Sequence, residues 1–427
     1  MRCFSNSLLI LLLLATGGIC CGPQEQIKSN DASIPPASEQ TRRSTATKAS
    51  TAGAESDMAA VVKGNNQFAL NLYAQLRTQN GNLFLSPSSI STALAMTYAG
   101  ARGDTARQMA ATLHFTLDQQ HLHPAFASLM KELKGNGAAR NYQLNIANAL
   151  WGQKGYAFLD GFISTAKDNY GAGLNQVDFA NTEEARRTIN AWVEQETQNR
   201  VKDLIKPDVL KKETRLVLTN AIYFKGNWAS HFKPENTREA PFMLTPKRKV
   251  MVPTMHQGGK FKTAWTENFR ALELPYAGKD LSMIVFVPRK EDGLAEFERT
   301  LTADKLDEWL SKLKENEIDV VALPKFKLTT GFELGQTLSA MGMPLAFASG
   351  ADFSGMTASE RLSISKVIHQ AFVDVNEEGT EAAAATGTEM RLVSVSMFVV
   401  DHPFIFLIRD NRSGSLLFMG RVTNPLG

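Results

Sequence analysis

The side chains that could catalyse a reaction are few and scattered along this chain. Its seven histidines are His114, His121, His123, His231, His256, His369 and His402. Ser86, His369 and Asp374 are the residue types of a hydrolytic triad, but no GxSxG motif surrounds a serine, and there is neither an HExxH motif nor a P-loop. The pair His121 and His123 could seat a metal ion, but it lacks the further ligands of a metal centre. We therefore expect no enzymatic activity, no metal and no cofactor.

Cysteine chemistry is confined to the front of the chain. All three cysteines, Cys3, Cys20 and Cys21, lie in the first 21 of 427 residues, so the body from Gly22 onward cannot form a disulfide or a thiolate zinc site. A basic residue, an apolar run from Leu8 to Ala15 and small residues predict a signal peptide over residues 1–21. The run is shorter than the ~20 residues that span a bilayer.

The protein is therefore expected to be secreted or extracellular. Cys20 or Cys21 is a candidate lipidation site of the bacterial lipoprotein type, which would hold the chain on the cell envelope. Cleavage nearby without a lipid is the alternative. Lys and Arg number 46 against 43 Asp and Glu, a net charge of +3, which gives no electrostatic reason for binding nucleic acid or an anionic membrane.

Two further zones follow the signal. Residues 22–57 contain no aromatic side chain and are rich in Ser, Thr, Ala, Pro and Gln, which predicts a disordered tether because too little apolar surface can be buried. Residues 58–427 contain no second linker and no internal repeat, which predicts one large domain.

The elements of that domain follow from the spacing of its apolar residues. Phe68, Leu72 and Leu76 mark one helix, and residues 88–101 and 181–204 predict two more. Strands are predicted where residues 144–150 alternate and where residues 216–224 and 281–287 are apolar throughout. Residues 404–408 and 416–422 predict a hairpin at the end of the chain. Helices early and strands late, without regular alternation, favour the α+β class.

One segment, DVNEEGTEAAAATGTEMRLVSVS at residues 374–396, fits neither pattern well. Read as a helix, Thr380 would be the N-cap of four alanines, but Gly387 would end the helix quickly. Read as a strand, the charges of residues 380–392 all fall on one face and the other face carries small side chains. A segment with two accessible conformations is what a switch requires.

This segment resembles the reactive-centre loop of inhibitory serpins, the family of serine protease inhibitors. The similarity extends over residues 62–427, with matching motifs in family order. They are NLFLSPSSISTALAMTYAGARGDTARQMAATLHF at 82–115, TNAIYFKGNW at 219–228, LPKF at 323–326, GADFSGM at 350–356, VDHPFIFLI at 400–408 and FMGRVTNP at 418–425. The resemblance implies a single domain of three β-sheets and about nine helices with an exposed loop over residues 377–398.

In this family a protease cleaves the loop, stays bound as an acyl-enzyme and is trapped when the loop inserts into the main sheet. The resemblance assigns a hinge, a buried polar cluster called the shutter, and an entry point called the breach. The hinge residues are Glu377, Glu378, Gly379, Thr380, Glu381, Ala382, Ala383, Ala384, Ala385 and Thr386. The shutter residues are Ser86, Ser89, Asn220 and His369, and the breach residue is Trp228. Small residues in the hinge favour an inhibitor over a non-inhibitory carrier or chaperone, which is the alternative.

The cleaved bond sets the target protease. Counting fourteen residues from Gly379, as the family does, places the reactive bond between Val393 and Ser394. Counting back from Pro403 gives Leu392 instead, and Arg391 is a further alternative. Valine suits the small apolar pocket of an elastase-like protease, whereas leucine suits a chymotrypsin-like one, and a cysteine protease stays open. The protein is expected to act as a monomer.

Overall fold

The computed structural model describes residues 39–135, 142–171, 173–358, 361–378 and 395–427. The cysteines, the signal peptide and the hinge from Gly379 to the reactive bond lie outside these residues. The helices have the following bounds: α1 Glu39–Leu76, α2 Pro87–Tyr98, α3 Gly103–Leu113, α4 Gln119–Lys134, α5 Asp160–Tyr170, α6 Thr182–Glu196, α7 Leu294–Thr300, α8 Ala303–Ser311 and α9 Gly335–Met341, with 3₁₀ helices η1 Pro234–Asn236 and η2 Pro344–Phe347.

The strands of the described residues form two hydrogen-bonded sheets. The five-stranded sheet has the order β10-β11-β4-β2-β3, and the larger sheet has the order β1-β14-β13-β8-β7-β6-β9-β12 with β5 beside β6. Their bounds are β1 Leu83–Leu85, β2 Tyr142–Gln153, β3 Leu174–Val177, β4 Leu216–Gly226, β5 Arg238–Thr245, β6 Arg248–Trp265, β7 Phe269–Pro275, β8 Leu281–Pro288, β9 Lys314–Pro324, β10 Phe326–Glu333, β11 Lys366–Val375, β12 Met397–Val399, β13 Phe404–Asp410 and β14 Leu416–Val422.

These elements confirm the α+β class and the predicted pattern. The apolar runs form β4 and β8, the alternating run forms β2, and the predicted hairpin is β13 with β14. Helix α6 is shorter than the predicted residues 181–204. It ends at Glu196 because Gln198 and Asn199 adopt positive φ angles of 52° and 59°, which no helix continues.

Three sheets were expected, but the described residues form two hydrogen-bonded sheets. The number is smaller because β6 is shared between two layers and joins them into one sheet. Its first part pairs with β5, and its later part pairs with β9 and β7. The strand is irregular between Gln257 and Gly259, where Gly258 lies so close to β9 that a Cβ would be 2.5 Å from the carbonyl oxygen of Asp319. This bulge lets one strand run continuously through what would otherwise be two sheets.

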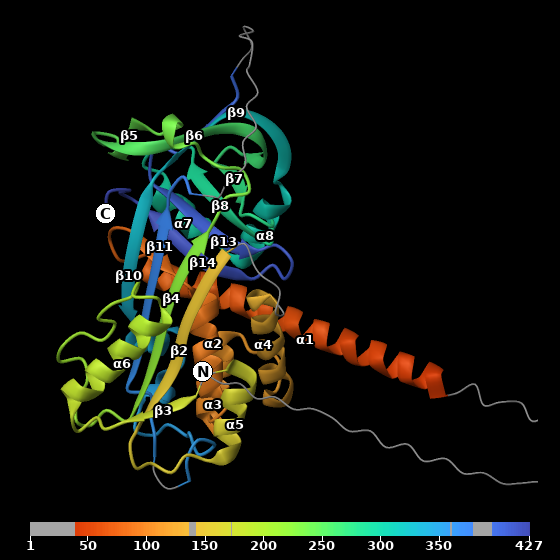
Figure 1. The fold of residues 1–427 in the computed structure, drawn as a ribbon, viewed down its shortest axis with the longest axis vertical. Helices are drawn as coiled ribbons and strands as arrows, with labels where there is room; N and C mark the ends of the chain where they lie inside the picture. The colour runs from red at the N-terminus through yellow and green to blue at the C-terminus, as the bar shows by residue number, and fades with distance from the viewer. Residues whose placement is uncertain (1–38, 136–141, 172, 359–360, 379–394) are drawn as a thin grey trace, which may run out of the picture. The chain divides into compact units, whose positions relative to one another are not determined.

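The five-stranded sheet has a different core on each face. Leu218, Ile222 and Phe224 of β4 point into the main core with α2, whereas Val217, Ala221 and Tyr223 pack with α6. Figure 1 shows the strands of this sheet running side by side between α6 and α2. Successive side chains of β4 therefore point into two different apolar cores. This explains why the sequence of β4 is apolar nearly throughout.

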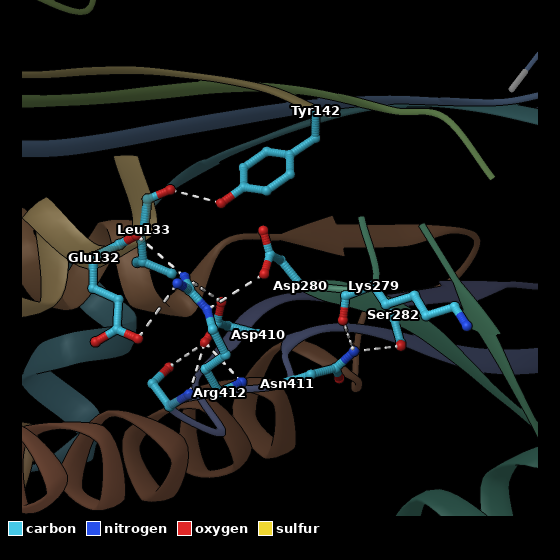
Figure 2. A network of polar contacts seen from close by, with 10 residues as sticks. Glu132, Leu133, Tyr142, Lys279, Asp280, Ser282, Asp410, Asn411 and Arg412 are labelled. Carbon is cyan, nitrogen blue, oxygen red and sulfur yellow. Dashed lines mark hydrogen bonds and ion pairs between the residues drawn. The ribbon is translucent and has the colours of Figure 1, made fainter. Parts of the chain in front are cut away.

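A polar network ties α4 to its neighbours (Figure 2). The guanidinium of Arg412, in the turn between β13 and β14, donates to the backbone oxygen of Glu132 at 3.2 Å and lies 3.6 Å from the Asp280 carboxylate. Asp410, which is fully buried, accepts from the backbone amide of Ser413 at 2.7 Å. The hydroxyl of Tyr142 on β2 donates to the backbone oxygen of Leu133 at 2.6 Å. The C-terminal end of α4 is thus joined to both sheets.

The predicted tether differs from the structure over its second part. Helix α1 begins at Glu39, so residues 39–57 are helical rather than disordered. No proline lies between Pro36 and Asp57, and alanine is frequent there, which permits a helix despite the few apolar residues. Contacts divide the chain into residues 1–49 and 50–427, so the compact unit begins before the predicted boundary at residue 58. No helix in the described part of the chain is long and apolar enough to cross a membrane.

Candidate functional site

The loop singled out by the sequence begins and ends on different sheets. It leaves the five-stranded sheet at Val375, the last residue of β11, and re-enters the structure at Val395, just before β12 of the larger sheet. Glu377 and Glu378 of the predicted hinge are described. Gly379 to Thr386 and the candidate cleavage residues Arg391, Leu392, Val393 and Ser394 lie outside the described residues. The site is therefore built from what holds the two ends.

Trp228 holds the backbone at the upstream end. Its indole nitrogen donates to the carbonyl oxygen of Asn376 at 3.0 Å. The ring is 3% exposed and stacks on Tyr276 with centroids 4.7 Å apart and planes 10° apart. Stacking and burial leave the indole little freedom, so its N–H is aimed at the first residue after β11.

Two ion pairs hold the side chains that follow. Glu377 lies 2.6 Å from the ammonium of Lys325 and accepts a hydrogen bond of 2.6 Å from the hydroxyl of Thr237. Burial works to raise the pKa of Glu377, but the bonds from Lys325 and Thr237 outweigh it and hold the pKa below its ordinary value. Glu378 pairs with Lys225 at 3.1 Å, on the surface. The start of the hinge is thus fastened to the sheet by side-chain contacts on both sides.

A cavity of about 310 Å³ lies directly beneath this anchored segment. It is lined by the ends of both β4 and β11 and by the anchoring rings, including Tyr223, Trp228, Tyr276, Phe372 and Asn376. The cavity therefore lies at the point where these two strands of the sheet end side by side.

A row of polar side chains crosses the sheet below the cavity. Asn148 of β2 is directly opposite Asn220 of β4, and Asn220 is directly opposite His369 of β11. All three strands are otherwise apolar on this face. The amide nitrogen of Asn220 donates to Asn148 and, at 2.6 Å, to the hydroxyl of Ser89, while the imidazole of His369 bonds to the amide oxygen of Asn220.

Two serines at the start of α2 contribute the remaining hydrogen bonds of this cluster. Ser86 is the N-cap of α2, and its hydroxyl accepts from the backbone amide of Ser89 and donates to the carbonyl oxygen of Leu417 at 2.7 Å. The Ser89 hydroxyl donates to Asn148 at 3.1 Å. The structure thus brings together the predicted shutter residues Ser86, Ser89, Asn220 and His369.

His369 is held in one neutral tautomer. The backbone amide of Ser86 donates to Nε2 at 3.2 Å, so Nδ1 carries the proton that is donated to Asn220. The ring is fully buried and stacked parallel to Phe332. Burial lowers the pKa of His369 to about 3, because no anion lies beside the ring to favour the imidazolium.

These contacts also exclude a hydrolytic triad of Ser86, His369 and Asp374. The Ser86 hydroxyl bonds to Leu417 rather than to His369, and Asp374 pairs with Lys327 at 2.9 Å. His121 pairs with Asp118, whereas His123 bonds to Tyr170. Among the described residues there is no group of three side chains that could hold a metal.

Two residues of the site were missed from the sequence. Asn148 is the polar residue on the inward face of β2, and its place among Leu144, Ile146 and Leu150 is a signal that could have identified it. Lys325 was noted only as part of the LPKF motif at residues 323–326. Its role depends on Glu377, which is far away in sequence and is brought to it by the pairing of β10 with β11.

The chain is similar to known proteins over most of its length. A family model described as "Serpin (serine protease inhibitor)" matches residues 63–425. Leukocyte elastase inhibitor of Bos taurus is 45% identical over 374 residues, covering 84% of this chain and 98% of that protein. The Homo sapiens protein of the same name is 44% identical over 375 residues, with the same coverage of each chain. The solved structure of uncleaved ovalbumin superposes with a TM-score of 0.79 at 30% identity, covering 86% of this chain and 100% of that one.

The buried histidine predicts a pH-dependent stability. The pKa of His369 is about 3 when folded and near 6.5 when unfolded, so the unfolded chain binds the extra proton between these values. The free energy of unfolding should be unaffected by this group above pH 6.5 and fall as pH drops below it, by up to ~1.4 kcal/mol per pH unit. Urea midpoints at pH 7, 6 and 5 measure this.

The variant His369→Gln isolates the effect, since it keeps a donor and an acceptor but cannot titrate. Its midpoint should depend less on pH than that of the unmodified protein, while the surface variant His121→Gln should not flatten the curve in this way. Parallel pH curves for His369→Gln and the unmodified protein would contradict the assignment.

The hinge anchor predicts a local effect of Lys325→Ala. Removing the ammonium leaves the Glu377 carboxylate, whose side chain is 11% exposed, without its cation, which should cost about 1–3 kcal/mol. Amide hydrogen exchange in a peptide containing residues 374–378 should become faster. Lys327→Ala is the matched control, because its pair with Asp374 lies on the surface with the lysine 60% exposed and should matter by under about 1 kcal/mol. Equal exchange in both variants would refute the anchor.

Proposed function

Because this chain belongs to the serpin family of serine protease inhibitors, we propose that it inactivates an elastase-like serine protease as a suicide substrate. The family is one of protease inhibitors and not of enzymes. The observation that carries the proposed mechanism is the direct parallel pairing of β4 with β11, at whose end the loop begins.

The pairing offers one place for a new strand. β4 and β11 are parallel over eight residue pairs, from Val217 with Lys366 to Phe224 with Val373. A loop that leaves the end of β11 and folds back between them would run antiparallel to both. One parallel ladder would then be exchanged for two antiparallel ladders, which have more hydrogen bonds in total and slightly better pairing per residue.

Opening the sheet at this place requires a specific bond to break. The hydrogen bond from His369 to Asn220 joins β11 to β4 across the line of separation. Asn220 would keep its hydrogen bonds to Ser89 and Asn148. His369 would keep the hydrogen bond that it accepts from the backbone amide of Ser86. We propose that this hydrogen bond keeps the shutter closed. We further propose that its strength, with the His369 imidazole neutral and buried, sets how easily β4 and β11 separate.

The proposed entry of the loop is the cavity beside Trp228. Thr380, Ala382 and Ala384 would enter first, and their small side chains suit a space between two packed strands better than bulky or charged ones would. The contacts of Asn376, Glu377 and Glu378 would be released or rearranged as the hinge turns.

The proposed reactive bond is Val393–Ser394, with Leu392 and Arg391 as alternatives. A valine before the bond suits an elastase-like pocket, and the two relatives named above are called leukocyte elastase inhibitors. Leu392 would suit a chymotrypsin-like protease, and a cysteine protease is a further candidate target. No cofactor is required by this mechanism, because the protease supplies the nucleophile that attacks the loop.

We further propose that the chain is secreted through the signal of residues 1–21 and acts as a monomer in the extracellular space. The apolar run from Leu8 to Ala15 supports export. Lipidation at Cys20 or Cys21 would anchor the inhibitor to the cell envelope, with the segment that follows as a spacer.

Mixing the protein with leukocyte elastase tests the function. We expect a covalent complex that survives SDS, because the acyl-enzyme is trapped before water reaches it. Denaturing gel electrophoresis detects the complex, and mass spectrometry of the released C-terminal peptide identifies the cleaved bond. The appearance of cleaved inhibitor together with fully active elastase would disprove trapping.

The variant Thr380→Arg is the control for insertion. A charged side chain at the first inserted position should slow entry, so that elastase is released and the variant is consumed as a substrate. Ala385→Thr, a small polar change farther along the same segment, should keep most of the trapping. Complex formation by Thr380→Arg at the unmodified level would contradict the insertion role.

Heat stability separates the inhibitor from a non-inhibitory carrier or chaperone. If cleavage lets the loop insert, the cleaved protein gains a strand in its main sheet and should melt far above the intact protein. Differential scanning calorimetry before and after cleavage of the loop by a protease that the protein does not trap measures the shift. Equal melting temperatures would favour the non-inhibitory alternative.

A further inference from the structure

His402 is a second buried histidine, and both of its ring nitrogens face oxygen atoms. The residue is 4% exposed and lies in the segment between β12 and β13. Its Nδ1 is 2.8 Å from an oxygen of the Asp401 carboxylate, and its Nε2 is 2.8 Å from the carbonyl oxygen of Pro288 at the end of β8. A backbone carbonyl and an ionised carboxylate only accept hydrogen bonds, so both ring nitrogens must be the donors.

The carboxylate of Asp401 is held in its ionised form. Burial works to raise the pKa of Asp401, but the hydrogen bond from His402 and the charges of His402 and Arg270 outweigh burial and hold the pKa below its ordinary value. Arg270 of β7 donates to the same carboxylate oxygen at 3.1 Å. This oxygen therefore accepts hydrogen bonds from two side chains that carry or can carry positive charge.

A neutral imidazole cannot satisfy both contacts of His402. Either neutral tautomer has a proton on one ring nitrogen and a lone pair on the other. The lone pair would face an oxygen atom 2.8 Å away, so that one of the two buried hydrogen bonds would not form. Only the imidazolium donates at both ends. His369 is the opposite case, because its Nε2 accepts from the amide of Ser86 and its ring is neutral.

The charged groups around His402 come from its own segment and from β7 and β8. Asp401 is in direct contact, Arg270 reaches the same carboxylate from β7, and Arg289 directly follows β8. The two arginines disfavour a further positive charge. Arg289, however, is drawn away to lie 5.4 Å from the ring centroid of Trp265. The carboxylate is the charge in direct contact with the imidazole, so attraction outweighs repulsion.

β5 and β9 contact the same segment through backbone groups. The amide of Met243 on β5 donates to the carbonyl oxygen of Asp401 at 2.7 Å. The amide of Val400 donates to the carbonyl oxygen of Ala322 on β9 at 2.9 Å. The backbone on which Asp401 and His402 lie is therefore fixed to two strands.

The same cluster holds β12, the strand at the downstream end of the loop. Arg270 bonds to the carbonyl oxygen of Val399, the last residue of β12, as well as to Asp401. Its guanidinium lies 5.8 Å from the ring centroid of Phe398, which is fully buried, whereas the neighbouring Met397 is 48% exposed. The imidazole of His402 then joins this cluster to the end of β8.

We propose that His402 is an imidazolium at neutral pH and forms, with Asp401 and Arg270, a pH-sensitive clamp that keeps β12 on the larger sheet. When the ring loses a proton, its hydrogen bond to either Asp401 or Pro288 is lost. This inference goes beyond the proposed function and does not require it, because it concerns how described residues hold one strand.

Two titrating groups limit the pH range of the clamp. In the unfolded chain His402 meets neither oxygen, so the folded state retains the ring proton more strongly. The contribution of the ring is therefore complete at acidic and neutral pH and is lost as the pH rises through the titration of the folded ring. Asp401 acts in the opposite direction, since its contribution is lost as the pH falls through its lowered pKa.

Nitrogen NMR of the full chain, labelled with ¹⁵N in its histidine rings, tests the charge directly. The chemical shifts of the two ring nitrogens show which of them carries a proton. At pH 7 we expect both nitrogens of His402 to be protonated, whereas His369 should have one protonated nitrogen. The His402 signal is identified by its loss in His402→Gln, or in His402→Arg if the first variant does not fold. A single ring proton on His402 at pH 7 would overturn the proposal.

Hydrogen exchange in a peptide of residues 397–400 tests the clamp, after correction for the intrinsic effect of pH on amide exchange. His402→Gln cannot carry a charge, so exchange at pH 7 should be about tenfold faster than in the unmodified protein, which corresponds to one pH unit of proton linkage. His402→Arg keeps the charge and should restore slow exchange, without the acceleration that we expect of the unmodified protein at alkaline pH. The matched control is His121→Gln, whose ring pairs with Asp118 on the surface and should change nothing in this peptide.

Three outcomes of the exchange experiment would contradict the clamp. The first is equal exchange in His402→Gln and the unmodified protein, and the second is no acceleration of the unmodified protein at alkaline pH. The third is equal acceleration in His402→Gln and His402→Arg, because it would give the ring a packing role instead of a charge. Both measurements are made without a protease, so their failure is distinct from a failure of the proposed trapping.

Discussion

The parallel contact between β4 and β11 is the constraint on which the rest of this structure depends. The two strands are neighbours with apolar residues on both faces, so separating them disturbs two cores. The row that contains Asn148, Asn220 and His369 is the polar exception on the inward face. Because His369 is buried, its hydrogen bond to Asn220 is stronger than the same bond would be in water. Because the imidazole is neutral, no charge is buried. Such a bond can be broken and replaced without leaving an ion in the core.

The two ends of the loop are held by different kinds of interaction. Upstream, Asn376, Glu377 and Glu378 are held by one indole hydrogen bond and two ion pairs, each of which a local turn of the chain can release. Downstream, β12 is held by a strand ladder and by the burial of Phe398. This difference means that the upstream end can move while the downstream end stays in place. An inserting loop requires that asymmetry.

Much of this arrangement was predictable from local sequence patterns. The apolar run of β4, the alternation of β2 and the final hairpin were predicted from residue spacing. A strand buried on one face alternates apolar and polar residues, and a strand buried on both faces is apolar throughout. The shutter residues and Trp228 came from resemblance, and the structure brings the four shutter residues together. Asn148 and Lys325 were missed because each acts through a partner that is distant in sequence. Helix over residues 39–57 was missed because composition alone does not separate a tether from a polar, alanine-rich helix.

By itself, the sequence determined the family, the small side chains of the hinge and the absence of cysteine from the body of the protein, since these are properties of residue type and order. Only the tertiary structure decided which strands are parallel neighbours, which hydrogen bond crosses the line where they part, and which side chains remain exposed beside the loop. The reason is that strand pairing joins residues far apart in the chain. Asn220 and His369 become partners through register, and the exposure of Met397 depends on Phe398 being drawn inward by Trp265 and Arg270.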